Sequence, residues 1–319
     1  MPKLGRVLIE KFHPEIVDWL KERVDVVEID PWVDTTGWER EASKVDAVIS
    51  RKGQIKREHM EGGRIKIVSR TGVGVDASRV DLDAARELRV WVTNQPGCNS
   101  IAVAEMAFAQ MLSLARHTHA ANVAVREGRW GDYTKFFGIE MAGKTMGIVG
   151  MGNIGARVAL RARAFEMDVA VYDPYIPEAS VTAMGGQMLP IDDLLSVSDF
   201  VTIHCPKTAE TNGLIDARRL ALMKPSAIIV NAARGGIIDE QALYDALIRR
   251  QIAGAALDAM AIEPPADDHP LFSLDNVLLS PHIGGGTEEA SSRGEWGAAE
   301  EVIRVLEGNR PKNPVIEFE

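Results

Sequence analysis

Three side chains far apart in the sequence, Arg234, Glu263 and His282, have the chemistry for acid–base work on a carboxylic acid. A guanidinium is a planar set of N–H donors that fits a carboxylate and an adjacent carbonyl oxygen. An imidazole gives and takes protons near neutral pH, and a carboxylate on its other ring nitrogen raises its pKa and holds it in place. Each residue alone also fits a structural role in a loop or turn. Together they predict a site that binds a carboxylate and moves a proton.

A glycine loop is the second chemical signal. The segment Gly150-Met151-Gly152-Asn153-Ile154-Gly155 matches G-x-G-x-x-G between an expected strand, 145–149, and an expected helix, 156–165. The first glycine allows a tight turn, the second lets the backbone approach a pyrophosphate, and the third lets the helix pack on the sheet. Asp173 ends the next strand, where it can accept from both adenosine ribose hydroxyls and repel a 2′-phosphate. These residues predict NAD rather than NADP; the alternative is that Asp173 caps a turn before Pro174.

Further polar residues follow successive strands of an expected parallel sheet. The strands are expected at 145–149, 169–172, 200–203, 227–230, 254–257 and 277–279, with helical spacers. The residues after them include His204-Cys205-Pro206, Asn231 to Gly236, Asp258, and Ser280-Pro281-His282. Open α/β sheets bind ligands outside the carboxyl ends of their strands, so we expect these residues at one edge. Singly each fits a structural role, such as Asp258 as a cap, but jointly they predict a ligand site.

The first hundred residues also alternate short β-branched runs with amphipathic stretches, which is typical of βαβ units. Strands are expected at 6–9, 24–29, 45–49, 65–69 and 89–92. Residues 100–126 contain no proline or glycine and predict one long helix that separates two units. A final helix is expected at 287–307. The pattern therefore predicts an α/β fold with two doubly wound parallel sheets.

Composition excludes several classes of protein. The chain has 319 residues, which fits two domains, and its 46% apolar and 26% charged residues are typical of globular proteins. A net charge of −10 without a basic block argues against nucleic acid as a partner, and no apolar run is long enough to span a membrane. Two cysteines make no disulfide framework and the amino terminus fits no signal peptide, so a cytoplasmic location is expected. His117 and His119 point to different faces of a helix, and no metal site is predicted.

In order and spacing, across nearly the whole chain, these motifs resemble the D-isomer-specific 2-hydroxyacid dehydrogenases. The segments 69–76 and 94–97 resemble further motifs of that family, closest to its phosphoglycerate dehydrogenase branch. The resemblance implies a Rossmann-type NAD-binding domain at 100–289, inserted into a discontinuous, flavodoxin-like substrate-binding domain at 1–99 plus 290–319. It also implies catalysis in the cleft between the domains and a homodimer built on the inserted domain. Two departures from the family pattern, Ala77 and the segment 257–262, leave the substrate open.

Carried over position by position, the resemblance assigns catalysis to Arg234, Glu263 and His282. It implies that the following residues bind the NAD cofactor: Gly150, Gly152, Asn153, Ile154, Gly155, Asp173, His204, Cys205, Pro206, Ala232, Arg234, Asp258, His282 and Gly285. It implies that the substrate is bound by Arg51, Val73, Gly74, Arg234 and His282, with backbone amides near Val73 and Gly74 on the substrate carboxylate.

The expected reaction is reversible hydride transfer between NAD and C2 of a small (R)-2-hydroxy acid. Arg51 and Lys52 match a cationic turn of the phosphoglycerate branch, which favours a substrate with a second anionic group; a solvated charge pair is the equal alternative. Two other functions remain open. One is a catalytically idle, NAD(H)-sensing interaction protein of the same fold, against which the intact Arg234, Glu263 and His282 argue. The other is an enzyme of another reaction class that uses bound NAD internally.

Overall fold

The computed structural model describes residues 2–75 and 79–318. The chain divides into two compact units: unit 1 is Met1–Asn99 with Gly286–Glu319, and unit 2 is Ser100–Gly285. The chain thus returns to unit 1 at residue 286, whereas the sequence motifs place this return at residue 290. Asp76 and Ala77, which belong to the motifs of the family resemblance, lie outside the described residues.

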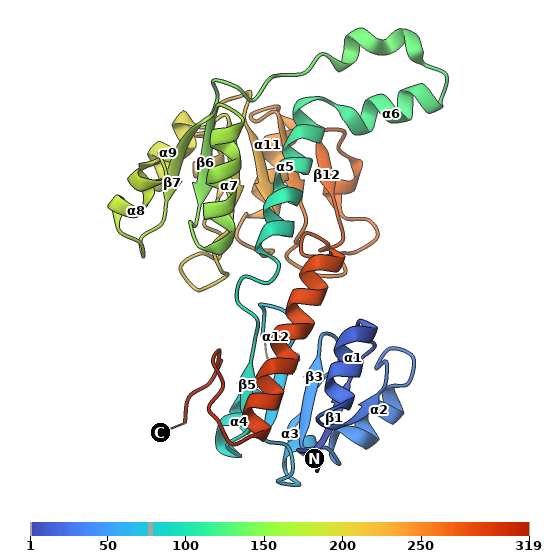
Figure 1. Ribbon diagram of the computed structural model, residues 1–319. Helices are drawn as coiled ribbons and strands as arrows, with labels where there is room; N and C mark the ends of the chain where they lie inside the picture. Colours follow the sequence, from blue (N-terminus) through green and yellow to red (C-terminus); the bar gives the residue numbers. More distant parts are fainter. Residues whose placement is uncertain (1, 76–78, 319) are drawn as a thin grey trace. The chain divides into compact units, whose positions relative to one another are not determined.

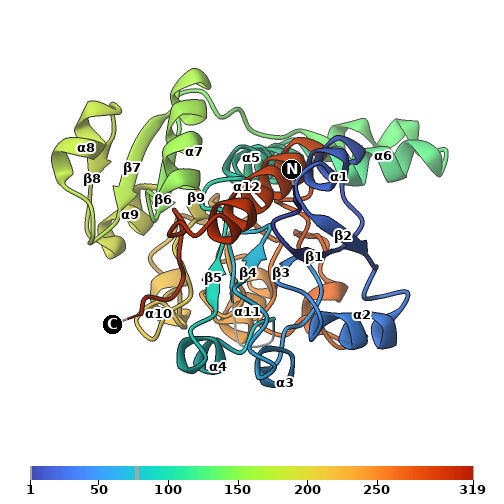
Figure 2. The same cartoon turned by 60° about the horizontal axis from the view of Figure 1, so that its bottom comes forward.

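Unit 1 contains a parallel five-stranded sheet in the order β2-β1-β3-β4-β5. Its strands are β1 (Arg6–Ile9), β2 (Asp25–Glu28), β3 (Ala47–Ser50), β4 (Ile67–Arg70) and β5 (Trp91–Thr93). Its helices are α1 (Pro14–Lys21), α2 (Thr35–Ala42), α3 (Arg57–Met60), α4 (Leu82–Glu87) and α12 (Glu288–Leu306). Figure 2 shows α1 and α12 on one side of this sheet and α2, α3 and α4 on the other. This strand order is that of a flavodoxin-like sheet.

Apolar side chains cover both faces of the unit 1 sheet, because the strands are buried on both sides. On one face, Val7 of β1 belongs to a core that includes Ala298 and Val302 of α12. On the other face, Leu8 belongs to a core that includes Trp38 of α2. The helix near the carboxyl terminus therefore completes the core that the first strands begin.

Unit 2 contains a parallel seven-stranded sheet in the order β12-β11-β10-β9-β6-β7-β8. Its strands are β6 (Thr145–Val149), β7 (Asp168–Tyr172), β8 (Gln187–Met188), β9 (Phe200–Ile203), β10 (Ile228–Asn231), β11 (Gly254–Leu257) and β12 (Val277–Leu279). Its helices are α5 (Ser100–Ala115), α6 (Thr118–Arg126), α7 (Asn153–Ala164), α8 (Glu178–Ala183), α9 (Ile191–Val197), α10 (Ala217–Leu220) and α11 (Glu240–Ile248), with 3-10 helices η1 (Trp130–Phe136) and η2 (Pro270–Ser273). Helices α5 and α7 cover one face and α9 and α11 the other (Figure 1). The predicted fold class, two doubly wound parallel sheets, is confirmed.

Two elements of unit 2 differ from those predicted. The single long helix at 100–126 is wrong, because α5 ends at Ala115 and α6 begins at Thr118, after His117 with φ 52°. The cause is a tertiary contact: the carbonyl of Ala115 accepts from the N–H of Ile139 (2.9 Å), which lies on a crossing segment. The predicted six-stranded sheet gains β8 as a seventh strand, since two residues are too few to form a sequence pattern.

Candidate active site

The predicted site residues of unit 2 follow the carboxyl ends of its strands. Gly150 follows β6, Asp173 follows β7 and His204 follows β9. The remaining strands are followed by Ala232 and Arg234 after β10, Asp258 after β11, and His282 and Gly285 after β12. Because all seven strands are parallel, these ends share one edge of the sheet, where open α/β sheets bind ligands.

His282 and Glu263 form a hydrogen-bonded pair at this edge. The Nδ1 atom of His282 lies 2.8 Å from Oε2 and 3.0 Å from Oε1 of Glu263. An ionised carboxylate can only accept, so Nδ1 carries a proton and Nε2 is the ring nitrogen left to exchange a proton with a ligand. The side chains are 44% exposed for His282 and 40% exposed for Glu263, so the pair is accessible.

Asp258 holds the loop that carries His282. The residue is 2% exposed, and its Oδ1 accepts from the Ser280 hydroxyl (2.6 Å) and from the N–H of Ile283 (2.9 Å). Its Oδ2 accepts from the N–H of Gly284 (2.7 Å). The backbone carbonyl of Asp258 accepts from the N–H of His282 (2.8 Å), whose φ is 53°. In these bonds Asp258 caps the loop after β12, which is the structural role that the sequence analysis named for it. The cofactor contact of Asp258 stays a prediction.

Arg234 lies on the loop after β10 and is exposed. Its Nη1 donates to the carbonyl of Ala233 (2.7 Å). The next residue, Gly235, packs so closely on the loop of Glu263 that a Cβ there would lie 1.8 Å from the carbonyl oxygen of Met260. The two loops therefore touch through their backbones, although no bond joins Arg234 to Glu263 or His282 among the described contacts.

The glycine loop between β6 and α7 fits a pyrophosphate. A Cβ on Gly150, whose φ is 91°, would lie 2.7 Å from the backbone nitrogen of Cys205, and one on Gly155 would lie 2.2 Å from the Gly150 carbonyl oxygen. Beside Gly152, in contrast, the space is open. Within the described residues no side chain caps α7, so its first amides are available to an anion. Open space beside uncapped amides is what a dinucleotide requires, and these residues fit NAD.

Asp173 is bonded to this loop. Its Oδ2 accepts from the N–H of Met151 (2.8 Å), and its Oδ1 accepts from the N–H of Tyr175 (2.9 Å). The second bond is the turn contact that the alternative interpretation expects after β7, and it leaves the cofactor role of Asp173 untested. Each carboxylate oxygen has a further lone pair, so a bond to a ribose hydroxyl stays a prediction.

The turn after β9 is uncharged at neutral pH. Burial lowers the pKa of His204 to about 3, and its Nε2 lies 2.8 Å from the Thr202 hydroxyl. Burial raises the pKa of the Cys205 thiol to about 11, so this thiol is a poor nucleophile. The buried Nδ1 of His204 has no hydrogen-bond partner among the described residues. The cofactor contacts predicted for His204, Cys205 and Pro206 suit a neutral turn and stay predictions.

Three of the predicted substrate residues belong to unit 1, where they follow β3 and β4. Arg51 is exposed, its Nη2 lies 3.4 Å from Oε1 of Glu295, and its N–H donates to the buried Glu10 (2.9 Å). Val73 and Gly74 are exposed after β4. Their contacts with substrate stay predictions.

Sequence reasoning did not find Gln110, which supports this edge, and it named Ser280 only within the segment Ser280-Pro281-His282. The Nε2 atom of Gln110 donates to the Ser280 hydroxyl (3.0 Å), which in turn donates to Asp258. Gln110 is 2% exposed in a helix that is otherwise rich in alanine, methionine and leucine. A buried amide requires a partner, so a lone glutamine in an apolar helix was the available signal.

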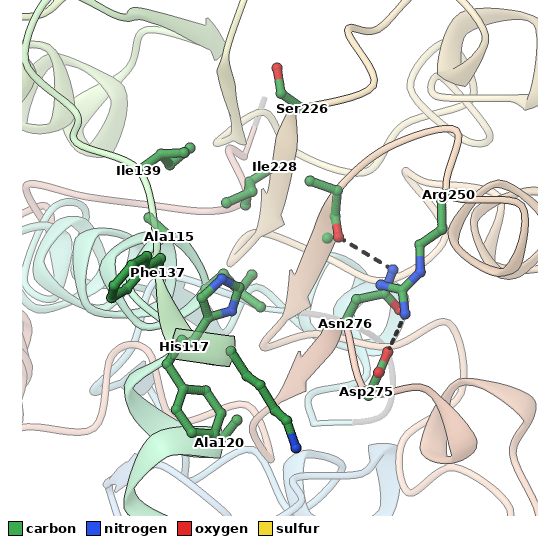
Figure 3. A pocket seen from close by; sticks show the side chains of 16 residues that line it. Ala115, His117, Ala120, Phe137, Ile139, Ser226, Ile228, Arg250, Asp275 and Asn276 are labelled. Atoms are coloured by element: carbon green, nitrogen blue, oxygen red, sulfur yellow. Dashed lines mark hydrogen bonds and ion pairs between the residues drawn. The ribbon is translucent and has the colours of Figure 1, made fainter. Parts of the chain in front are cut away.

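A separate pocket of about 390 Å³ lies at the amino-terminal edge of the unit 2 sheet (Figure 3). Its lining includes Phe137, Ile139 and Ile228, and Arg250 and Asp275 form an ion pair there (2.8 Å). None of the predicted site residues lines it.

In the part of the chain that the structure describes, neither a group of metal ligands nor a membrane-spanning helix is found. No three histidine, cysteine, aspartate or glutamate side chains in residues 2–75 and 79–318 are grouped as metal ligands. No helix in these ranges combines the length and apolar character of a membrane span.

Residues 108–284, more than half of the chain, match the family described as "D-isomer specific 2-hydroxyacid dehydrogenase, NAD binding domain". The protein belongs to this family. The predictions of the family and of an NAD-binding domain are thereby confirmed.

This dehydrogenase family member is similar to several known proteins. It is 39% identical over 313 residues to D-3-phosphoglycerate dehydrogenase of Archaeoglobus fulgidus, with 97% of this chain and 59% of the relative covered. It is 38% identical to hydroxypyruvate reductase of Thermotoga maritima, with 94% of each chain covered. The crystal structure of a glyoxylate reductase from Paecilomyes thermophila has a TM-score of 0.83 at 27% identity over 99% of both chains. The chain therefore spans about 59% of the length of the first of these relatives.

Proposed function

We propose that this protein is an NAD-dependent oxidoreductase that interconverts a small (R)-2-hydroxy acid and its 2-oxo acid by hydride transfer at C2. The observation that carries the proposal is the His282–Glu263 pair, with 2.8 Å between Nδ1 and Oε2, on the same sheet edge as the glycine loop. An imidazole held by a carboxylate is the group that such a reaction needs beside its cofactor. Nicotinamide supplies the hydride acceptor or donor.

The residues of unit 2 have distinct parts in this proposal. In oxidation, Nε2 of His282 accepts the proton of the substrate hydroxyl; in reduction, the imidazolium returns a proton to the carbonyl oxygen. Glu263 keeps the proton on Nδ1 and balances the positive charge when both ring nitrogens are protonated. The guanidinium of Arg234 binds the substrate carboxylate and the neighbouring oxygen on C2.

The cofactor is held by the loop and turns after β6, β7 and β9 in this proposal. The first amides of α7, at Asn153 and Ile154, bind the pyrophosphate, and Gly152 leaves room for it. Asp173 accepts from the adenosine ribose hydroxyls, which favours NAD over a cofactor with a 2′-phosphate.

The substrate beyond C2 is the open part of the proposal. The relatives include D-3-phosphoglycerate dehydrogenases and a hydroxypyruvate reductase. The substrate in the first name carries a phosphate, and the substrate in the second name does not. We propose that the substrate carries a second anionic group besides its carboxylate and that Arg51 binds this group. Val73 and Gly74 are proposed to bind the substrate carboxylate through their amides.

We also propose a cytoplasmic homodimer built on unit 2. The segment α6–η1 projects from the sheet of unit 2 (Figure 1), and it exposes 75% of Trp130 and 63% of Tyr133. Phe137, which follows η1 and lines the pocket of Figure 3, is 75% exposed. Large apolar side chains gathered on one projecting segment are typical of a protein–protein contact.

The cytoplasmic part of the proposal is supported by the cysteines. Both cysteines are free thiols, as a reducing compartment requires.

The test is the absorbance of NADH with a panel of 2-hydroxy and 2-oxo acids, alongside direct titration of NADH binding. Enantiomer-specific formation or loss of NADH with one acid of the panel supports the proposal. Binding of NADH without turnover of any acid supports the idle, NAD(H)-sensing alternative. Conversion of a substrate with no net change in NADH supports an enzyme that recycles its bound NAD.

A further inference from the structure

A second carboxylate–imidazole pair lies next to the loop of Glu263. Glu240 is the first residue of α11, and its side chain is 16% exposed. Its Oε1 accepts from the N–H of Ala261 (2.6 Å), and its Oε2 lies 3.3 Å from Nε2 of His269. Neither Glu240 nor His269 is among the predicted site residues, and both belong to unit 2.

The hydrogen bonds of His269 define its tautomer. Its Nδ1 accepts from the N–H of Leu271 (3.4 Å), so the ring proton lies on Nε2, the nitrogen that is 3.3 Å from Oε2 of Glu240. Glu240 therefore accepts a hydrogen bond from Ala261 on one carboxylate oxygen and has Nε2 of His269 within ion-pair distance of the other. Ala261 and His269 lie near the two ends of the segment 260–269, so the first residue of α11 contacts both ends.

This segment carries Glu263. The N–H of Met260 donates to Oε1 of Glu263 (3.1 Å), and the next N–H along the chain, that of Ala261, is the one that Glu240 accepts. Glu263 in turn accepts from Nδ1 of His282. A continuous path of bonds thus runs from the start of α11, through two successive backbone amides, to the imidazole.

We propose that Glu240 and His269 are positioning residues that hold the segment 260–269 so that the carboxylate of Glu263 stays on Nδ1 of His282. This inference rests on the proposed function, because it takes His282 as the acid–base group. A purely structural role for Glu240 is the stabilisation of the amino terminus of α11 by its negative charge. That terminus already has a cap, since Asp239 accepts from the N–H of Ala242 (3.0 Å).

Steady-state kinetics of Glu240→Ala and Glu240→Gln, with Asp239→Ala as the matched control, test this role. We expect Glu240→Ala to lower kcat by about ten- to a hundred-fold, since a misplacement of about 1 Å has an effect of that order, and to leave the KM for NADH unchanged. Glu240→Gln keeps an oxygen that accepts from Ala261, so it restores most of kcat. Asp239→Ala weakens the same helix without touching the segment 260–269 and keeps kcat near that of the wild type.

The double variant with Glu263→Ala decides whether Glu240 acts through Glu263. In that background Glu240→Ala should lower kcat no further, because the carboxylate that it positions is gone. A full additional loss overturns the proposal. So does an equal loss of kcat in Glu240→Ala and Asp239→Ala, which would report helix stability alone.

Failure of the proposed function would look different, because the wild-type protein would then turn over no acid of the panel. Hydrogen exchange of the Ala261 amide tests the hold on the segment without any turnover. Faster exchange in Glu240→Ala than in Asp239→Ala supports it, and equal exchange overturns it.

Discussion

Replacing Asp258 by asparagine tests whether this carboxylate serves the His282 loop or the cofactor. Asp258 accepts from three donors, of Ser280, Ile283 and Gly284, over distances of 2.6 to 2.9 Å. Asparagine has one acceptor oxygen, so its NH2 group must face at least one of these donors. The N–H of Gly284 is then left without an acceptor if the oxygen takes the place of Oδ1. A lost charge-assisted bond and an unpaired buried N–H together predict a decrease of about 2 to 3 kcal/mol in the free energy of unfolding.

The kinetic effect of Asp258→Asn follows from the same bonds. Because the loop 280–284 is fixed on one side by Asp258, we expect His282 to be misplaced and kcat to fall by about ten-fold or more. The assay is kcat and the KM for NADH at saturating substrate, with the unfolding midpoint in urea. Ser280→Ala is the control: it removes one donor to Asp258 and the acceptor of the Gln110 amide, but it leaves both carboxylate oxygens in place for Ile283 and Gly284. Its loss in the free energy of unfolding should be about 1 to 3 kcal/mol. A wild-type kcat with a raised KM for NADH would refute this reasoning and place the carboxylate on the cofactor.

Four further predictions follow from particular residues. His282→Ala should lower kcat by about 10² to 10⁴ with NADH binding nearly intact, measured by fluorescence titration, because the proton-transfer group is lost while the glycine loop is unchanged; lost NADH binding would contradict that role. The wild type should lose stability relative to His204→Gln as the pH falls below about 6.5, by up to about 1.4 kcal/mol per pH unit. The reason is that burial lowers the pKa of His204 in the folded protein to about 3, so the unfolded chain takes up the proton first. Urea midpoints of the two proteins that stay parallel from pH 7.5 to 4.5 would contradict this prediction. Trp130→Ser should shift the light-scattering mass of the dimer towards that of the monomer, whereas Tyr175→Ser, at a residue that is 84% exposed elsewhere on unit 2, should not. Arg51→Gln should lower kcat/KM more for acids with a second anionic group than for glycerate or lactate, and an equal loss on both classes would count against the proposed recognition.

Much of the fold was predictable because both sheets are parallel and buried on both faces. Each strand, such as β9, therefore appears in the sequence as a short apolar run between helical stretches. The elements that were missed depend on contacts from distant residues. The end of α5 is set by Ile139, which takes up the carbonyl of Ala115, and no local pattern near residue 115 signals this bond.

The candidate site was predictable where residue type limits chemistry. The sequence was enough to predict that an imidazole and a carboxylate after neighbouring strands form a pair. The structure contains this pair as the hydrogen bond between Glu263 and His282. The supporting bonds were not predictable, because aspartate and glutamate serve as caps and charge partners throughout a protein. Asp258 and Glu240 accept backbone N–H groups of the two loops that carry His282 and Glu263, and folding brings these groups to them.

The position of α12 has a consequence for the newly made polypeptide. The first ninety-nine residues leave the ribosome without Ala298 and Val302, the side chains that cover Val7 on one face of their sheet. Translation at roughly 5–20 residues per second delays that helix by on the order of ten seconds or more. Unit 2 is contiguous and can fold within this interval, while the face of the unit 1 sheet that α12 packs on is covered only in part, by α1. Chaperone dependence during synthesis is therefore expected to be concentrated in strands β1 to β5, which are made before α12.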